Sequence, residues 1–439
     1  MNQTPPFTHD GTGTDPSAWL DVLTGRAVPD LGAFDHVVVL AAHPDDETLG
    51  AGGLMARAFS HGCRVTVVVA TDGEASHPES PTRTAASLGA ARRHEVDRAT
   101  RRLAPTRELT LLGLPDGGLD DRERSVVEAL VDIIGRGGDR TLLVAPFRHD
   151  GHPDHEAAGR AAAVTASRTD ALLREYPIWL WHWGDPADWA GLRWESAELR
   201  DADRAVKDMA MAEHRTQVEP LSARAGDEAL LGEHVLAHFR GEREWFIDGP
   251  PAQDRDLDEL HAREPDPWAT RTSPYEQAKQ EAVLEALGGR HFRRALDLGC
   301  SVGTLTAALA DRADAVLAVD ASAHAVDRAR AAFVDRSNVQ VEQRTLPDDW
   351  PVAPFDLVVA SEVGYFLSPR AWSRTLDAVA GTVPVGGWFL LCHWLHDVRG
   401  WPLDGTLVHE EALRREGWRV VSSRRADDYR IDLLERVAG

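Results

Sequence analysis

The first half of the chain alternates short apolar runs with longer segments of helical periodicity. Strands alternating with helices of this length predict βαβ units and a parallel sheet. The predicted strands are Val37–Ala42, Val65–Ala70, Leu109–Leu112 and Leu142–Ala145, and the clearest helices between them are Ala85–Leu103 and Arg124–Gly135. A Trp-containing irregular segment, Asp185–Trp194, and a polar-faced helix over Ala197–Glu213 follow.

The alternation restarts after a stretch rich in proline and charge, Asp248–Pro267. The predicted helices are Tyr275–Leu287, Thr304–Ala310 and Ala323–Phe333, and the predicted strands are Arg294–Leu298, Ala315–Val319, Phe355–Ala360 and Gly387–Cys392. Trp418–Ser422 and Arg430–Glu435 predict a closing antiparallel pair. The fold class predicted for the whole chain is α/β, with two Rossmann-like doubly wound domains in series.

Length and breaker residues suggest the domain boundaries. We expect an N-terminal extension over 1–33, a first domain over 34–249, a linker over 250–265 and a second domain over 266–439. A chain of 439 residues is longer than one hydrophobic core usually serves.

Composition narrows the function classes. The 71 Asp and Glu against 48 Lys and Arg give a net charge of −23, which argues against binding nucleic acid or an anionic membrane. Three cysteines without a Cys-x-x-Cys pair fit a reduced cytoplasm and exclude a thiolate zinc cluster. With no signal peptide or membrane-spanning run, we expect a soluble cytoplasmic protein, and the sequence leaves a homo-oligomer open.

Metal-binding side chains begin where the first predicted strand ends. His43 and Asp46 are three residues apart in a turn and can reach one ion, and His155 from a later loop can complete the set. Asp45 is then free to take a proton from a water, and His152 is suited to the developing oxyanion or the leaving amine.

Blander interpretations exist for each of these residues. His43 alone is explained by a local hydrogen bond at a strand end, and Asp45–Asp46 by a helix N-cap. Asp154 can orient an imidazole from behind and is kept with the catalytic candidates. Pro153 argues against a helix through the later histidines. An imidazole–carboxylate set also accepts iron or cobalt in place of Zn²⁺.

Five motifs together resemble the LmbE/PIG-L family of zinc-dependent N-deacetylases. They are Ala42-His-Pro-Asp-Asp-Glu47, Thr71-Asp-Gly-Glu74, Arg92-x-x-Glu95, Leu114-Pro-Asp-Gly117 and His152-Pro-Asp-His155, and Lys207 and His214–Gln217 look like the family's later element. The resemblance implies Zn²⁺ on His43, Asp46 and His155, with Asp45 as general base and His152 as the oxyanion or acid partner.

The same resemblance implies a substrate class. It predicts an N-acetylamino sugar or glycosylated natural product as the small-molecule substrate, contacted by Arg92 and Asp116. An Arg92–Glu95 helix pair explains the arginine equally well.

A glycine-rich loop follows a strand in the second domain. Asp297-Leu-Gly299-Cys300-Ser-Val-Gly303 opens a helix, and Asp320 ends the next strand, where its carboxylate can accept ribose hydroxyls. A nicotinamide-binding unit is the rival interpretation, but Ser301 departs from the G-x-G-x-x-G pattern.

Later segments of this domain resemble class I S-adenosylmethionine methyltransferases. Phe355–Leu367 resembles their fourth motif, and Asp266-Pro-Trp268, Ser273-Pro-Tyr275-Glu276 and Cys300 look like the nodulation-protein-S branch, which N-methylates a deacetylated amino sugar. The resemblance implies that S-adenosyl-L-methionine is held by Asp297, Gly299, Cys300, Gly303 and Asp320, with Leu346 beside the adenine and Trp268 and Tyr275 over the methionine end.

Three residues are candidates near the methyl acceptor: Glu362, Tyr365 and His393. For His393 a satisfied core-edge histidine is an equally good explanation, and Gly364 stands where a larger apolar residue is usual. We therefore predict a bifunctional enzyme that deacetylates an amino sugar and N-methylates the freed amine. The alternatives are an O-methyltransferase partner domain, or one domain acting only as a binding or regulatory module.

Overall fold

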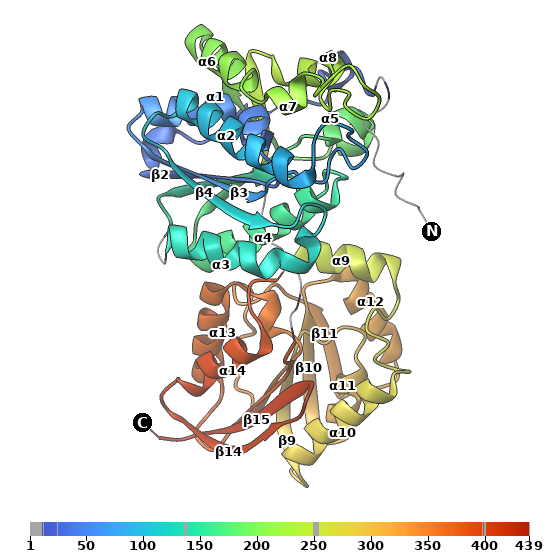
Figure 1. Cartoon of the computed structure of the whole chain (residues 1–439). Helices are drawn as coiled ribbons and strands as arrows, with labels where there is room; N and C mark the ends of the chain where they lie inside the picture. The colour runs from blue at the N-terminus through green and yellow to red at the C-terminus, as the bar shows by residue number, and fades with distance from the viewer. Residues whose placement is uncertain are drawn as a thin grey trace. The chain divides into compact units, whose positions relative to one another are not determined.

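The chain folds as two compact units, each built on its own sheet (Figure 1). The computed structural model describes residue 11 and residues 13–23, 25–135, 138–248, 254–396, 398 and 401–438. The first unit is Met1–Pro251 and the second is Ala252–Gly439. Two α/β sheets in series confirm the predicted fold class, although both sheets are mixed rather than wholly parallel.

The first unit has an eight-stranded sheet in the order β1-β7-β8-β6-β5-β2-β3-β4. β2 pairs in parallel with β3 and β5, and β8 is antiparallel to β6 and β7. The strands are β1 Arg26–Ala27, β2 His36–Ala41, β3 Arg64–Thr71, β4 Glu108–Leu114, β5 Thr141–Pro146, β6 Leu172–Tyr176, β7 Trp194–Glu198 and β8 Arg243–Asp248.

Helices cover both faces of this sheet because β2 is apolar on both sides. Val37 and Val39 belong to one core cluster, and Val38 and Leu40 to the other. α1, α2 and α6 lie on the first face and α3 and α4 on the second (Figure 1). The helices are α1 Asp46–Ser60, α2 Ala85–Leu103, α3 Glu123–Ile134, α4 Pro153–Thr169, α5 Leu180–Trp183, α6 Asp201–Met211, α7 Arg215–Val218 and α8 Glu233–Leu236.

Three sequence expectations for this unit need correction. Pro153 is the first residue of α4, a position whose N–H would have no partner within the helix, so proline is tolerated there. The later histidine motif is therefore helical, contrary to the expectation. Ala197 lies in strand β7, and the helix expected from there starts only at Asp201. The expected N-terminal extension is partly integrated, since β1 pairs with β7 and Trp19 is buried.

The second unit has a seven-stranded sheet in the order β11-β10-β9-β12-β13-β15-β14. The first five of these strands run parallel, and β15 is antiparallel to β13 and β14, which confirms the closing pair. The strands are β9 Phe292–Leu298, β10 Ala313–Asp320, β11 Val339–Gln343, β12 Leu357–Ser361, β13 Trp388–Trp394, β14 Trp418–Arg425 and β15 Tyr429–Arg436. The helices are α9 Asp254–Arg263, α10 Pro274–Leu287, α11 Thr304–Ala310, α12 Ala323–Ala332, α13 Pro369–Thr382 and α14 Gly405–Leu413.

The segment expected to be a linker contains helix α9. This helix contacts α12, and the Asp258 carboxylate accepts a hydrogen bond of 2.7 Å from the Ser322 hydroxyl. Most of the range 250–265 therefore packs as part of the second unit.

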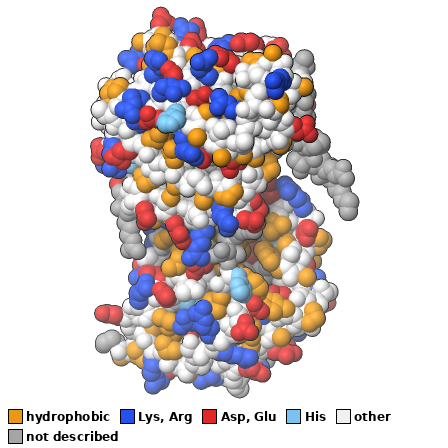
Figure 2. Space-filling view, viewed as in Figure 1, with side chains coloured by type: hydrophobic (Ala, Val, Ile, Leu, Met, Phe, Trp, Pro, Cys, Tyr) orange, Lys and Arg blue, Asp and Glu red, His pale blue; other side chains and the backbone are white. Residues whose placement is uncertain are grey.

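The surface is charged and mixed in sign. On the face shown in Figure 2, basic and acidic side chains are interspersed over both units. Among the described residues, no helix is both long and apolar enough to cross a membrane.

Candidate functional site

The first site lies at the carboxyl end of β2, the strand at which the order of strand addition to the sheet changes sides. The chain runs from β2 outward to β3 and β4, then returns to β5 on the other side of β2. Such switch points are where open α/β sheets bind ligands. His43 follows β2 directly, and Asp46 opens α1.

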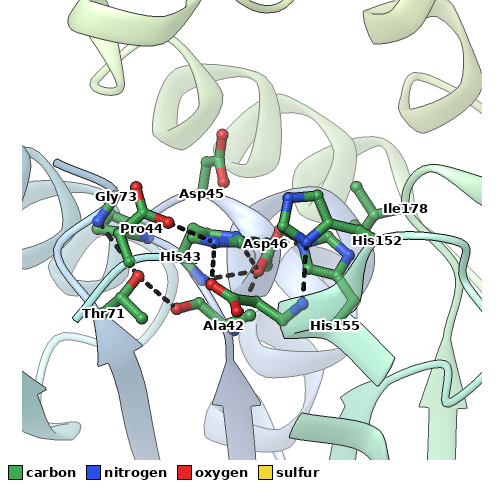
Figure 3. Close-up of polar contacts among 12 residues, drawn as sticks. Ala42, His43, Pro44, Asp45, Asp46, Thr71, Gly73, His152, His155 and Ile178 are labelled. Carbon is green, nitrogen blue, oxygen red and sulfur yellow. Dashed lines mark hydrogen bonds and ion pairs between the residues drawn. The ribbon is translucent and has the colours of Figure 1, made fainter. Parts of the chain in front are cut away.

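Three side chains converge at this point (Figure 3). The His43 Nδ1 atom lies 3.2 Å from His155 Nε2 and 3.7 Å from Asp46 Oδ2, and His155 Nε2 lies 3.3 Å from Asp46 Oδ1. Tetrahedral ligands about 2.1 Å from an ion stand about 3.4 Å apart. The two imidazole nitrogens and the Asp46 carboxylate, which turns a different oxygen to each imidazole, are therefore close enough to share one zinc ion.

Carboxylates behind the two imidazoles fix which nitrogen faces the centre. Asp150 lies 2.7 Å from His155 Nδ1, and Asp154 and Asp116 lie 3.2 and 3.1 Å from His43 Nε2. A carboxylate only accepts, so each of these outer nitrogens carries the proton. The inner nitrogens, Nε2 of His155 and Nδ1 of His43, are left with lone pairs for a cation.

Asp46 is anchored through one oxygen only. Its Oδ2 accepts hydrogen bonds from the backbone N–H groups of Ala42 (3.0 Å) and His43 (2.8 Å). Burial alone would raise the pKa of this carboxyl, but the nearby His155 and His43 hold it well below the usual range. The charged form is the one a cation binds.

Asp45 differs from Asp46 in position and environment. Figure 3 shows its carboxylate on the side of the cluster away from the strand ends. Burial, with the charge of Asp46 added, raises its pKa well above the ordinary value. Its backbone is strained, with φ 129°, a conformation that L-residues rarely adopt and that persists where the surroundings impose it.

His152 completes the cluster as the N-cap of α4. Its Nδ1 accepts a hydrogen bond of 3.2 Å from the Asp154 N–H, and its ring lies 4.9 Å from His43 and 4.6 Å from His155, centre to centre. Burial, reinforced by His155 and His43, lowers its pKa to about 2. Ligand atoms of His43, His152 and His155 also lie within 4.8 Å of one another, so His152 is a second candidate for the third ligand position.

The two predicted substrate residues hold the neighbouring loop. Arg92 is 1% exposed and donates to the Gly73 carbonyl (2.6 Å) and the Ser76 hydroxyl (2.9 Å). The Asp116 carboxylate accepts from the Ala75 N–H at 2.8 Å as well as facing His43. Both side chains thus shape the wall beside the cluster.

Residues far along the chain fix the turn that carries the site. The Gln217 side chain donates to the Pro44 carbonyl, and His214 Nε2 lies 3.0 Å from the Thr48 hydroxyl. The Lys207 ammonium donates to the Leu49 carbonyl at 2.7 Å. Asp150 is the residue that sequence reasoning missed, and its place two residues before His152 was the available signal.

The second site is the loop between β9 and α11. Gly299 and Gly303 have φ of 68° and 84°, and an added Cβ would lie 2.8 Å from a Val363 methyl or 2.5 Å from the Phe333 ring. The Asp320 carboxylate accepts from the Ser301 N–H (2.8 Å) and the Ser322 N–H (2.9 Å). Asp320 is thereby fixed at the mouth of the glycine-rich loop.

Asp297 and Cys300 lie deeper than the loop surface. The Asp297 carboxylate accepts from the Thr306 hydroxyl at 2.6 Å, and burial raises its pKa to about 7. Burial likewise raises the thiol pKa of Cys300 well above the ordinary value. Within the described part of the chain, the buried hydroxyls of Ser301 in this loop and of Tyr275 on α10 have no hydrogen-bond partner. Such unpaired groups fit a polar cofactor.

The remaining cofactor candidates lie at the rim. Trp268 is 39% exposed, and its ring lies 5.3 Å from His261 and 6.4 Å from Phe366, centre to centre. Leu346 is partly buried against a core cluster of the second unit.

Glu362 is bound on both carboxylate oxygens. Its Oε1 accepts from the Lys279 ammonium at 2.8 Å, and its Oε2 accepts from the Trp394 N–H at 3.1 Å and from the Tyr365 hydroxyl. Lys279, which sequence reasoning missed, lies on α10 and is buried. Its ion pair means that Glu362 meets an acceptor as part of a charge-balanced group rather than as a lone base.

His393 occupies the core-edge position of the alternative explanation. It is fully buried, its Nε2 accepts from the Gly364 N–H, and its Nδ1 faces His409. Both ring nitrogens thus have partners inside the protein, which favours the core-edge explanation.

Comparison with known proteins places a deacetylase domain first and a methyltransferase domain second. Residues 38–166 match the PIG-L family, described as GlcNAc-PI de-N-acetylase, and residues 250–380 match the nodulation protein S (NodS) family. The chain belongs to the PIG-L family through its first unit and carries a NodS-like methyltransferase domain in its second.

Three curated relatives illustrate the match. The 1D-myo-inositol 2-acetamido-2-deoxy-alpha-D-glucopyranoside deacetylase of Tsukamurella paurometabola is 32% identical over 40% of this chain and 68% of its own length. The probable N-acetyl-alpha-D-glucosaminyl L-malate deacetylase 2 of Bacillus subtilis is 28% identical over 46% of this chain and 92% of its own. Nodulation protein S of Azorhizobium caulinodans is 30% identical over 27% of this chain, and the chain spans 58% of its length.

Proposed function

We propose that the first unit is a zinc-dependent N-deacetylase of an acetamido sugar. The observation that carries this proposal is the convergence of His43, Asp46 and His155 beside a carboxylate, Asp45, that lies apart from them. The two deacetylase relatives are named for N-acetylglucosaminyl compounds, which supports the same substrate class here.

Each residue of the cluster has a defined task in amide hydrolysis. His43, Asp46 and His155 would hold the zinc ion, which when bound would lower the pKa of a water and polarise the acetyl carbonyl. Asp45 accepts the proton of the attacking water, for which its buried position suits it. His152, a neutral imidazole, faces the developing oxyanion. The proton that Asp45 takes from the water passes to the leaving nitrogen, so that the C–N bond breaks to give acetate and a primary amine.

We further propose that the second unit methylates an amine with S-adenosyl-L-methionine. Asp320 and the Gly299–Gly303 loop bind the cofactor, with the unpaired Ser301 and Tyr275 hydroxyls as additional donors. The amine nitrogen attacks the methyl carbon, the S–CH₃ bond breaks to give S-adenosylhomocysteine, and the amine loses one proton. Alignment dominates such a transfer.

The fusion supports coupling of the two reactions. Deacetylation yields a primary amine, and a primary amine is the acceptor class of an N-methyltransferase. We propose that the amine freed by the first unit is the one methylated by the second.

One experiment tests both halves. Purified protein is analysed for bound metal and incubated with a panel of N-acetyl sugars and S-adenosylmethionine, and products are followed by mass spectrometry. Asp45→Asn should keep zinc and lose deacetylation, while Asp120→Asn, at an exposed surface pair with Arg160, serves as the control. Loss of zinc in Asp45→Asn would mean that base and ligand are misassigned, and methylation of a hydroxyl alone would overturn the coupled scheme.

A further inference from the structure

A chain of buried polar side chains runs through the second unit to the turn that carries Tyr365. The Gly364 N–H donates to His393 Nε2 at 3.0 Å, His393 Nδ1 lies 3.2 Å from His409 Nε2, and His409 Nδ1 lies 2.6 Å from Asp432 Oδ2. The three side chains come from β13, α14 and β15 and are all 0% exposed.

The positions of the protons in this chain follow from its two ends. Asp432 only accepts, so His409 carries its proton on Nδ1 and its Nε2 accepts from His393. His393 therefore carries its proton on Nδ1, and its Nε2 lone pair accepts from the Gly364 amide. The carboxylate at one end thus dictates the hydrogen bond at the other.

This series of hydrogen bonds explains the glycine at position 364. An added Cβ there would lie 2.5 Å from a Val408 methyl and 3.1 Å from His393 Nε2. A larger residue would push the backbone away from the imidazole. The glycine is needed so that the amide can reach His393.

At Gly364 this series of hydrogen bonds ends beside the Glu362–Tyr365 pair, the candidate residues near the methyl acceptor. Gly364 lies between Glu362 and Tyr365, whose side chains are hydrogen-bonded to each other. The backbone of Trp394, the residue after His393, also donates to Glu362. Two residues in succession on β13 thus hold the Glu362–Tyr365 pair, one through the Gly364 amide and one directly.

We propose that Asp432, His409 and His393 are positioning residues for methyl transfer. Acting through the Gly364 amide, they hold the Glu362 carboxylate and the Tyr365 hydroxyl, together with Lys279, in the geometry that receives the acceptor amine. This inference rests on the proposed N-methyltransferase function. Simple packing would be served at least as well by apolar side chains, because burying polar groups carries a desolvation cost.

The test separates orientation from folding. Asp432 Oδ2 also lies 2.8 Å from Arg430 Nε, so an asparagine there would keep its amide oxygen toward His409 and Arg430. Asp432→Leu removes the acceptor altogether and leaves His409 free to carry its proton on the other nitrogen. His393→Gln keeps an acceptor for Gly364 and a donor for His409, whereas His393→Leu keeps neither. Asp377→Asn, at an exposed pair with Arg415, is the matched control.

Three measurements are made on the full chain: kcat and KM for the amine, S-adenosylhomocysteine affinity by calorimetry, and histidine tautomers by ¹⁵N NMR. His393→Gln identifies the His393 signal by its absence. We expect the wild-type signal to be the Nδ1–H form. Asp432→Leu and His393→Leu should lose about 10- to 100-fold in kcat at nearly unchanged S-adenosylhomocysteine affinity, with recovery in His393→Gln.

Two outcomes overturn the proposal. One is an Nε2–H tautomer for His393 in the wild type, and the other is an unchanged kcat in folded Asp432→Leu and His393→Leu. If the wild type methylates no amine, the proposed function fails and the positioning role fails with it, while the tautomer signal still reports whether the hydrogen-bond chain exists. Loss of folding in His393→Leu leaves Asp432→Leu and His393→Gln to decide.

Discussion

Asp150→Asn should weaken metal binding although it replaces none of the proposed metal ligands. Asp150 is 1% exposed, and its carboxylate is bonded on both oxygens. Oδ1 accepts from the Ile178 and Leu180 N–H groups at 2.8 and 3.0 Å, and Oδ2 accepts from the Trp179 N–H at 3.0 Å and from His155 Nδ1 at 2.7 Å. Every partner is a donor, so the site requires two acceptor oxygens.

Asparagine replaces one of these oxygens with an NH₂ group. Placed at Oδ1, the NH₂ would face two backbone N–H groups. Placed at Oδ2, it faces one N–H and His155, and the imidazole can relieve that conflict by moving its proton to Nε2. The second orientation costs less, and it removes the lone pair that His155 needs for zinc.

The size of the effect follows from comparable residues behind metal ligands, whose loss weakens binding by about 10- to 100-fold. This corresponds to about 1.4–2.7 kcal/mol of binding free energy. Zinc affinity is measured by competition with a chelating dye, with circular dichroism to verify folding and Asp120→Asn as control. Wild-type affinity in a folded Asp150→Asn protein would refute the assignment of His155 as a ligand oriented by Asp150.

Three further predictions concern stability and the cofactor. Lys207→Met should cost about 3–5 kcal/mol of unfolding free energy, because it leaves the buried Glu244 carboxylate without its cation. The double variant Lys207→Met with Glu244→Gln should recover part of this loss in urea titrations. Equal losses in the single and double variants would contradict a stabilising Lys207–Glu244 ion pair. Burial, helped by Arg64, lowers the pKa of His36 to about 4, so the unfolded chain binds a proton at a higher pH than the folded protein does. Stability should therefore fall by up to about 3 kcal/mol as the pH drops from 6.5 to 4. His36→Gln should make the stability less dependent on pH in this range, and an unchanged dependence would argue against the role of His36. Asp320→Asn should weaken S-adenosylmethionine binding about tenfold in calorimetry through loss of charge-assisted hydrogen bonds to the ribose, and full affinity would remove Asp320 from the site.

The sequence predicted the buried strands because their apolar runs admit few alternatives. Val37 to Ala42 has no polar side chain, and the structure places β2 there with every residue buried. Ala197 was misassigned to a helix because its neighbour Glu195 is charged, and a periodicity argument takes a charged residue to be exposed. In the structure Glu195 is buried in β7, where it forms an ion pair with Arg174. Pairing partners of this kind are set by the tertiary fold.

The candidate sites divide in the same way. His43, Asp46 and His155 could be grouped from motif and strand-end position, since parallel strands bring such loops together. Asp150 and Lys279 carry no motif of their own, and their importance lies in which atoms they touch. The sequence suggested a role near the methyl acceptor for His393. Its partners His409 and Asp432 lie on other elements, so these contacts could not be predicted from the sequence.

The three amides that hold Asp150 have an optical consequence. They belong to Ile178, Trp179 and Leu180, and the Trp179 ring is stacked on Trp183 at 5.2 Å between centres. One carboxylate thus links this indole pair to His155. We expect a shift of this imidazole on cation binding to reach Trp179 through Asp150, so intrinsic emission is a label-free measurement with which to test metal loading in solution.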